Sequence, residues 1–173
     1  MRRLLGCLVC LMLALPVFAA AVRVGEPAPT FRLQDQHGRW QSPEDHRGRW
    51  LVLYFYPRDF TPGCTSEACA FRDGVVKLRQ AGADVVGVSL DPVTSHAQFA
   101  AKYHLPFPLL SDADGQVART YGVLTETAGT PHARRCTFLI DPAGRIAKVY
   151  EDVDPERNVA QVLVDLARLQ AGA

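Results

Sequence analysis

The stretch that decides the fold is YFYPRDFTPGCTSEAC, residues 54–69. It begins inside a continuous apolar run, Trp50–Tyr56, which stops at Pro57. Such a run is typical of a strand that is buried on both faces of a sheet. A helix is predicted to begin after Pro62-Gly63 and to end near Gln80. The stretch therefore joins a central strand to a long helix through a short loop.

Outward from this stretch, predicted strands alternate with predicted helices. Further strands are expected at 84–90, 107–110, 136–140 and 146–150, further helices at 95–103, 116–121 and 158–169, and a small hairpin at 31–34 and 40–41. The last two strands flank Asp141-Pro142-Ala143-Gly144, a turn signature. This order predicts one α/β domain with a central mixed sheet that helices cover on both faces.

The composition argues against two classes of partner. The chain has 173 residues and a formal net charge of +1, with 19 Lys plus Arg against 18 Asp plus Glu. These charges are scattered along the sequence without a basic cluster. We therefore expect no nucleic-acid partner and no electrostatic attachment to a membrane surface.

The N-terminus has the pattern of an export signal, residues 1–21. Two arginines precede an apolar run of 15 residues, Leu4–Phe18, and the small residues Ala19–Ala21 follow it. The run is short for a membrane-spanning helix, which needs about 20 apolar residues. An uncleaved anchor and a lipoprotein attached at Cys7 remain as alternatives. We expect cleavage, a mature domain of residues 22–173 without stable membrane association, and a periplasmic or otherwise exported location.

Cleavage would leave three cysteines, Cys64, Cys69 and Cys136. Three thiols cannot all pair within one chain, so at least one is free or reactive. Cys136 lies in an apolar predicted strand, where a free cysteine is often buried and inert.

Cys64 falls in the first turn of the predicted helix. Unpaired backbone N–H groups and the positive end of the helix dipole favour an anion there. The thiolate, rather than the thiol, is the nucleophilic form of cysteine. This position therefore predicts a reactive cysteine.

Cys69 follows Cys64 by five residues. In an intact helix these positions lie about 140° apart around the axis, with Cα atoms roughly 8–9 Å apart. Disulfides seldom span more than about 7 Å between Cα atoms. A Cys64–Cys69 disulfide thus requires the first helical turn to unwind. Residues 22–173 contain no Cys-x-x-Cys, which argues against a thioredoxin-type oxidoreductase.

Residues 54–69 resemble the active-site segment of the peroxiredoxins, specifically the bacterioferritin comigratory protein (PrxQ) subfamily of the AhpC/TSA family. A second match is RCTFLID, residues 135–141, which is similar to the Arg-x-Thr-Phe-x-Ile-Asp strand of that subfamily. Order and spacing agree from Val24 to the C-terminus. The resemblance implies a thioredoxin-like fold and a thiol-dependent peroxidase that needs no metal, haem or flavin cofactor.

The resemblance also implies a role for each motif residue. Cys64 would be the peroxidatic cysteine and Cys69 the resolving one. Thr61 would hydrogen-bond the thiolate and the peroxide, and Pro57 would shield the sulfur from water. Arg135 would stabilise the thiolate and polarise the peroxide.

Plainer roles remain open for several of these residues. Thr61 suits a helix cap, Pro57 a strand terminator and Arg135 a surface salt bridge, with Arg134 the less suitable arginine by register. Glu67 would orient its neighbours or interact with the helix dipole. Cys136, in place of Cys69, is an alternative partner for Cys64.

Hydrogen peroxide and organic hydroperoxides are the substrates that the resemblance implies, with a thioredoxin-like protein as reductant and a monomeric state. The segment Thr125–Arg134 matches the subfamily only loosely, and we expect a loop there that shapes the substrate mouth. The five histidines show no ligand-like spacing, so solvated or locally bonded roles are expected. Two rival classes remain: a periplasmic disulfide reductase and a non-enzymatic holdase.

Overall fold

The computed structural model describes residues 22–151 and 153–172; the predicted export signal, with Cys7 and Cys10, lies outside these residues. The strands are β1 Leu33–Asp35, β2 Trp40–Gln41, β3 Trp50–Phe55, β4 Ala83–Ser89, β5 Leu109–Ser111, β6 Leu124–Thr127, β7 Thr130–Ala133, β8 Cys136–Ile140 and β9 Ile146–Tyr150. The helices are α1 Pro62–Gln80, α2 Val93–Tyr103, α3 Gln116–Thr120 and α4 Asn158–Ala171, with a short 3-10 helix, η1, at Pro43–His46.

The described strands form a seven-stranded sheet in the order β2-β1-β5-β4-β3-β8-β9, and β6 pairs with β7 in a separate two-stranded sheet. The central strands β3, β4 and β5 run parallel, whereas β8, β9, β1 and β2 pair antiparallel with their neighbours. The predicted mixed sheet is therefore confirmed. Since β3 and β8 are antiparallel, the end of β3 lies beside the start of β8.

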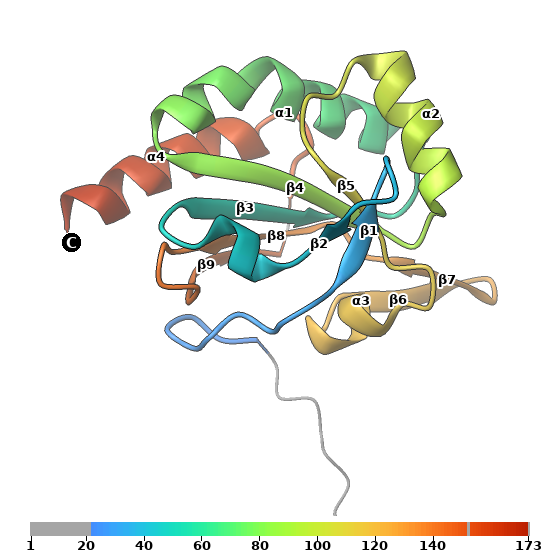
Figure 1. Cartoon of the computed structure of the whole chain (residues 1–173), viewed down its shortest axis with the longest axis horizontal. Coiled ribbons are helices and arrows are strands. Elements are labelled where there is room, and N and C mark those ends of the chain that lie inside the picture. The colour runs from blue at the N-terminus through green and yellow to red at the C-terminus, as the bar shows by residue number, and fades with distance from the viewer. Residues whose placement is uncertain (1–21, 152, 173) are drawn as a thin grey trace, which may run out of the picture.

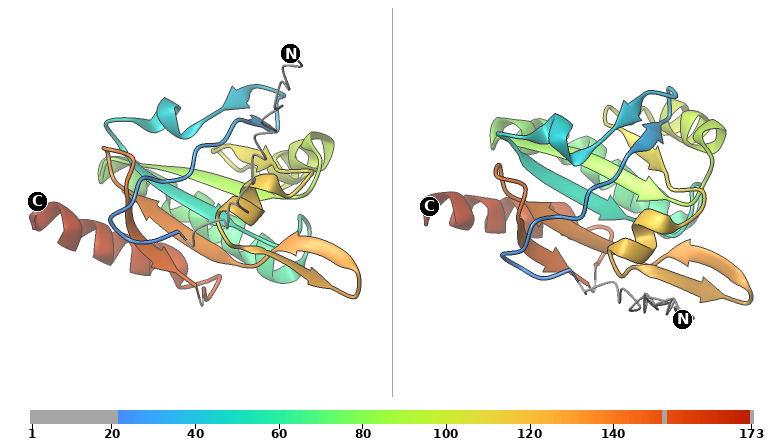
Figure 2. Two further views of the ribbon diagram at one scale, coloured as in Figure 1. Left: turned by 90° about the horizontal axis from the view of Figure 1, so that it is seen from below. Right: turned by 60° about the horizontal axis from the view of Figure 1, so that its bottom comes forward.

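Helices lie on both faces of the sheet (Figure 1). The long helices α1, α2 and α4 cover one face, and α3 lies on the other with the β6–β7 hairpin. Residues 22–31 start beside β9, where Gly25 and Ala28 donate backbone hydrogen bonds to Ile146 and Gly144, and run across this second face toward β1 (Figure 2). These layers bury two apolar cores, one on each side of the sheet.

The side chains of β3 alternate between these cores. Val52 and Tyr54 face the core beneath α1, and Leu53 and Phe55 face the opposite one. The Tyr54 ring lies over Gly87 of β4, where an added Cβ would stand 2.7 Å from the ring. Only glycine leaves room for this ring, which stacks in turn on Phe71 of α1.

The segment Thr125–Arg134 is a β-hairpin rather than the loop that its sequence suggested. Its residues are mostly exposed, and Pro131 interrupts the β-forming pattern, so no regular alternation of buried and exposed residues reveals the strands. Ala128 and Gly129 form the two-residue turn, both with positive φ, as a tight hairpin turn requires. The remaining predicted elements are present, with ends that differ by a few residues.

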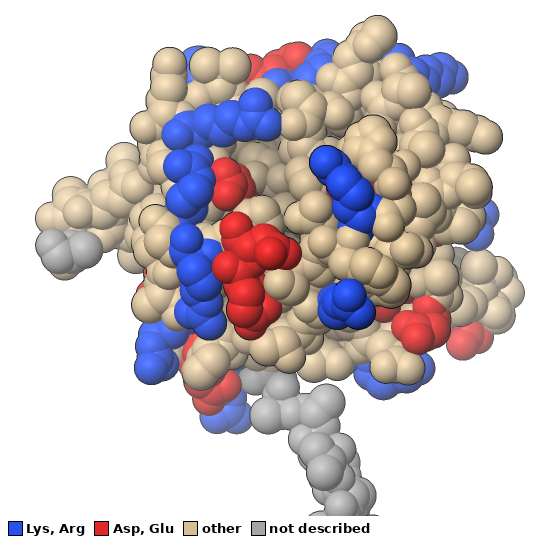
Figure 3. Space-filling view, viewed as in Figure 1, with Lys and Arg blue, Asp and Glu red and all other residues tan. Residues whose placement is uncertain are grey.

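Charges of both signs are mixed on the surface. On the face in Figure 3, a row of basic side chains lies directly beside acidic ones. One such contact joins Arg49 to Asp84, with 2.9 Å between guanidinium and carboxylate. Among the described residues, no helix is both long enough and apolar enough to cross a membrane.

Candidate active site

Cys64 is the third residue of α1. Thr61, in an extended conformation, immediately precedes the helix, and Pro62 opens it. The first N–H groups of a helix have no intrahelical acceptor, so they and the helix dipole stabilise negative charge on the Cys64 sulfur. The side chain is only 2% exposed, and it packs into the core beneath α1.

Arg135 brings a cation to this sulfur. It directly precedes β8, whose first residue Cys136 pairs with Phe55 at the end of β3. Its Nη2 donates a hydrogen bond to Cys64 Sγ over 3.3 Å. Burial acts to lower the pKa of Arg135, but Glu67 and Cys64 raise it above its usual value, so the guanidinium stays charged.

Glu67 lies on the other side of this guanidinium. Its carboxylate is fully buried and accepts a hydrogen bond from Arg135 Nη1. Burial raises the pKa of Glu67 to about 7, while Arg135 acts in the opposite direction. Its second oxygen has no hydrogen-bond partner among the described residues. Glu67 therefore orients Arg135, as one of its expected roles required, and adds a group that titrates near neutrality.

Thr61 and Pro57 occupy the loop before α1. The Thr61 hydroxyl donates to the Arg58 carbonyl over 3.0 Å, and it neither caps the helix nor contacts the Cys64 sulfur. The hydrogen bond to the thiolate that the resemblance implies is therefore not present in this conformation. The oxygen of Thr61 keeps lone pairs that accept hydrogen bonds.

Pro57 borders a hollow of about 290 Å³ that the β6–β7 hairpin closes from the other side. The hairpin contributes Thr127, Thr130 and His132, and Arg58 completes the lining. Residues 125–134, which match the subfamily only loosely, thus form a hairpin that faces the loop at Pro57.

Cys69 is half-buried on α1, and both it and Cys64 are free thiols. The first turn of α1 is intact, with Thr65 N–H donating to the Thr61 carbonyl over 2.9 Å. Helix geometry keeps the two sulfurs apart while this turn persists. The structure thus shows Cys64 and Cys69 as free thiols on an intact helix.

Cys136 lies on the opposite side of the sheet from Cys64. Its side chain is fully buried in the core that faces α3, whereas Cys64 belongs to the core beneath α1. Burial raises the pKa of the Cys136 thiol to about 12. The expectation that Cys136 is buried is confirmed, and a Cys64–Cys136 bond would require the sheet to come apart.

A buried polar cluster next to the loop escaped the sequence analysis. Asp59, 4% exposed, accepts hydrogen bonds from Tyr56 and Ser95 and contacts the ring of His96. His96 is fully buried and 37 residues from Asp59, so the expectation of a solvated or locally bonded histidine is wrong for it. In the sequence, the cluster is indicated only by an Asp and by a later Ser-His pair at a helix start. This combination is too common to predict a buried cluster.

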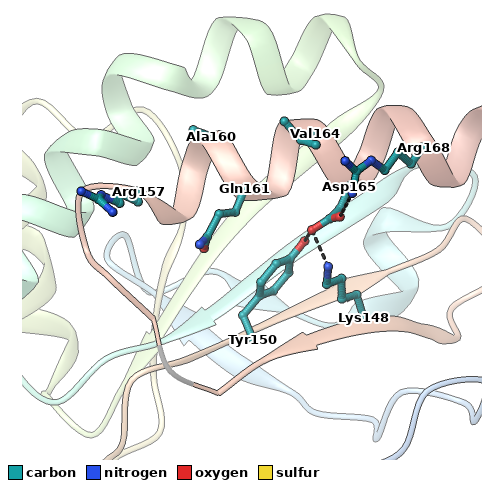
Figure 4. A pocket seen from close by; sticks show the side chains of 8 residues that line it. All are labelled: Lys148, Tyr150, Arg157, Ala160, Gln161, Val164, Asp165 and Arg168. Carbon is teal, nitrogen blue, oxygen red and sulfur yellow. Dashed lines mark hydrogen bonds and ion pairs between the residues drawn. The ribbon is translucent and has the colours of Figure 1, made fainter.

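The described residues contain no group of His, Cys, Asp and Glu side chains arranged to hold a metal ion. A groove of about 610 Å³ lies elsewhere, between β9 and α4 (Figure 4). There Lys148 and Tyr150 both donate to Asp165, over 2.6 and 2.9 Å. Since these polar groups satisfy one another, the contact fastens α4 to the sheet.

A family model described as the AhpC/TSA family matches residues 24–149. The chain belongs to this family. A similar AhpC/TSA relative is a putative peroxiredoxin bcp from Coxiella burnetii (strain RSA 493 / Nine Mile phase I). It is 44% identical over 147 residues, which cover 83% of this chain and 97% of the relative.

Two solved AhpC/TSA structures match closely. A mutant PrxQ from Xylella fastidiosa superposes with a TM-score of 0.82 and 32% identity, covering 87% of this chain and 99% of that one. The bacterioferritin comigratory protein of Xanthomonas campestris gives a TM-score of 0.78 and 34% identity, covering 85% and 99%. The expected PrxQ resemblance and the thioredoxin-like peroxiredoxin fold are confirmed.

Proposed function

We propose that this protein is a thiol-dependent peroxidase that reduces hydroperoxides at Cys64 and forms an intramolecular disulfide with Cys69. Its membership of the AhpC/TSA family and its PrxQ and bcp relatives support the peroxidase activity. The assignment of Cys64 as the reacting residue depends on one observation. The Arg135 guanidinium lies 3.3 Å from the Cys64 sulfur, at the start of α1.

In the first step the Cys64 thiolate attacks the terminal oxygen of the hydroperoxide. The O–O bond breaks, the sulfur keeps the terminal OH as a sulfenic acid, and the departing oxygen takes a proton from solvent and leaves as water or an alcohol. Arg135 and the first N–H groups of α1 stabilise the charge on the attacking sulfur and on the departing oxygen. Thr61 accepts a hydrogen bond from the peroxide O–H, since its own proton is donated to Arg58.

In the second step the Cys69 thiol attacks the sulfur of the sulfenic acid, and water leaves as the disulfide forms. The first turn of α1 unwinds to bring the sulfurs together. An external dithiol then supplies two electrons and two protons, which restore both thiols. The reaction uses no metal or organic cofactor.

Access to Cys64 limits the substrate to a hydroperoxide with a narrow reacting end, because the sulfur is nearly buried. The Xanthomonas campestris bacterioferritin comigratory protein has alkyl peroxide reduction activity. The hollow between Pro57 and the β6–β7 hairpin is wide enough for the organic part of such a molecule. We therefore include organic hydroperoxides with hydrogen peroxide.

The cellular setting is part of the proposal. The N-terminal pattern supports export and cleavage near residue 21, and a thioredoxin-like protein of the same compartment would then be the reductant. We propose a monomer. Mass spectrometry of the secreted protein's N-terminus and sedimentation of the reduced and oxidised forms test these two points.

Peroxide consumption by cysteine variants tests the mechanism. Cys64→Ser should consume no peroxide, because it lacks the nucleophile. Cys69→Ser should consume a single equivalent and should not be recycled by thioredoxin with its reductase. Cys136→Ser is the matched control and should turn over like the wild type. Full recycling of Cys69→Ser would exclude Cys69 as the resolving thiol.

A further inference from the structure

The loop between β3 and α1 is fastened to the protein at Asp59. Its neighbours Arg58 and Phe60 are exposed, whereas Asp59 is only 4% exposed. A carboxylate is seldom buried in this way unless it is paired or fully hydrogen-bonded. The contacts of this one residue therefore decide how the loop is held.

Both the side chain and the backbone of Asp59 are bonded to other elements. One carboxylate oxygen accepts from the Tyr56 hydroxyl over 2.7 Å, and the other accepts from Ser95 over 2.7 Å. That second oxygen also lies 2.9 Å from Nδ1 of His96. The Asp59 N–H donates to Asp91, which precedes α2, over 2.9 Å. Three of these four partners lie at the start of α2 or just before it.

Counting the protons on the hydrogen-bonding atoms shows that each polar atom of His96 and Asp59 in this cluster has a partner. The Leu110 carbonyl, 3.2 Å from His96 Nε2, can only accept, so Nε2 carries a proton. The contact between Nδ1 and the Asp59 carboxylate needs one further proton, on either partner. The His96–Asp59 pair is then neutral overall, and its polar atoms face one another. The cluster therefore holds the loop against α2, and its polar atoms have no free position for a ligand.

Phe60 extends the fastening by one residue. It has a φ of 61°, a left-handed conformation that is unfavourable for a bulky side chain. Its ring packs on Phe99 and Tyr103 of α2, with centroids 5.0 and 6.5 Å apart. Thr61 and the first turn of α1 follow at once. The loop is thus attached to α2 directly before the segment that must unwind.

We propose that Asp59 is a positioning residue that sets the balance between two forms of α1. In the helical form Cys64 meets Arg135 and reacts with peroxide; in the unwound form Cys64 meets Cys69. Without the carboxylate, Tyr56, Ser95 and His96 lose their shared acceptor in the interior, and the attachment of the loop to α2 is weakened to the Asp59 N–H bond and the Phe60 contacts. The inference rests on the proposed peroxidase function.

The test separates the two chemical steps in the full chain. Rapid mixing with hydrogen peroxide, acid quenching and mass spectrometry give the rate of Cys64 oxidation and the rate of disulfide formation. For Asp59→Ala we expect oxidation to slow about tenfold and disulfide formation to accelerate several-fold. We also expect a higher peroxide dose to be needed for sulfinic acid, because the sulfenic acid is consumed sooner.

Two further variants show whether the effect belongs to the Asp59 cluster. Asp59→Asn keeps an acceptor for Tyr56 and offers its amide N–H to a neutral His96, so it should restore most of the wild-type ratio of the two rates. Asp112→Ala is the matched control, since Asp112 is equally buried and accepts from the N–H groups of Val117 and Ala118 at α3. It should lower thermal stability and leave the ratio unchanged.

Hydrogen exchange of the reduced proteins gives a readout without peroxide. Amides 65–69 should exchange faster in Asp59→Ala than in the wild type. They should also exchange faster in Ser95→Ala, which is the milder substitution. If both rates fall in parallel, or if Asp112→Ala changes the ratio as much, the inference fails while the proposed function stands. If the wild type forms no Cys64–Cys69 disulfide, both fail together.

Discussion

Glu67, Arg135 and Cys64 form a row in which one guanidinium donates hydrogen bonds to both a carboxyl group and a sulfur. Arg135 donates to Glu67 through Nη1 and to Cys64 through Nη2. Burial raises the pKa of Glu67 to about 7, so its charge changes close to neutral pH. When Glu67 is protonated, Arg135 no longer faces a carboxylate, and the Cys64 sulfur is its remaining partner in this row.

The raised pKa of Glu67 predicts a pH-dependent stability. A carboxyl whose pKa rises from 4.5 to about 7 on folding adds stability that is full below pH 4.5 and is lost as the pH rises through 7. Urea titrations of the wild type and Glu67→Gln should show this difference. Between pH 4.5 and 7.5, the wild type should lose about 3 kcal/mol of unfolding free energy relative to the variant.

Glu67→Gln is almost isosteric, so the comparison isolates the titrating proton. Asp165→Asn serves as a control, because its pKa is lowered by its hydrogen bonds to Lys148 and Tyr150 despite the opposing effect of burial. That variant should lose its stability difference from the wild type toward acid pH. Parallel pH profiles for the wild type and Glu67→Gln would contradict a raised pKa at Glu67.

The sequence named the candidate reactive residues more completely than the residues that hold them in place. Cys64, Cys69 and Arg135 were identified because they sit in a long spaced pattern. Asp59 and Glu67 lie in the same stretch, but their burial depends on α2 and on Arg135, which are distant in sequence. The Thr61 hydroxyl illustrates the same limit, because its direction depends on the local fold of the loop.

At the scale of elements, apolar patterning predicted most helices and strands, since their buried faces repeat at the expected periods. The central strand and the two strands β8 and β9 agree almost to the residue. The β6–β7 hairpin was missed because most of its residues are exposed, and only Ala133 and Leu124 pack against the core, too few to form a periodic pattern. Helix starts at Pro62 and Val93 differ by two residues or fewer from expectation.

The contact between α1 and α4 predicts a specific packing defect. A Cβ at Gly74 of α1 would overlap the Val159 side chain of α4. Gly74→Ala should therefore lower the unfolding free energy by about 1–3 kcal/mol, despite the better helix propensity of alanine. Urea denaturation measures the loss.

A double-mutant cycle supplies the control for Gly74. Val159→Ala alone should cost stability by removing buried methyl groups, whereas the double variant should recover part of the loss from Gly74→Ala. Val164→Ala, at an exposed position on α4, should change little. Strictly additive effects at positions 74 and 159 would count against the overlap.

At the scale of the whole molecule, the alternation of strands and helices predicted a covered mixed sheet, but not the strand order. The position of β8 beside β3 follows from long-range pairing, which local patterns do not encode. That pairing decides the site, because it brings Arg135 to Cys64 from 71 residues away. The functional arrangement is thus a property of the complete sheet.

Oxidation should weaken the molecule as a whole. In the proposed mechanism, formation of the Cys64–Cys69 disulfide would unwind the first turn of α1 and remove Cys64 from the core beneath that helix. We expect the oxidised protein to melt about 3–10 °C below the reduced protein in calorimetry. Cys69→Ser, which cannot form the bond, should show no such decrease after mild oxidation. An oxidised form of equal or higher melting temperature would contradict the expected loss of packing.

Under the proposed function, the antiparallel pairing of β3 with β8 would also govern when the Cys64 thiol becomes reactive. The sulfur and its cation come from distant parts of the polypeptide and meet only after the sheet has closed. A chain still emerging from a ribosome, or held open by a chaperone, carries an ordinary cysteine with slow peroxide chemistry. The enzyme therefore gains its reactivity toward peroxide only by folding. Molecules that have not yet folded react slowly with the oxidant that the folded enzyme reduces.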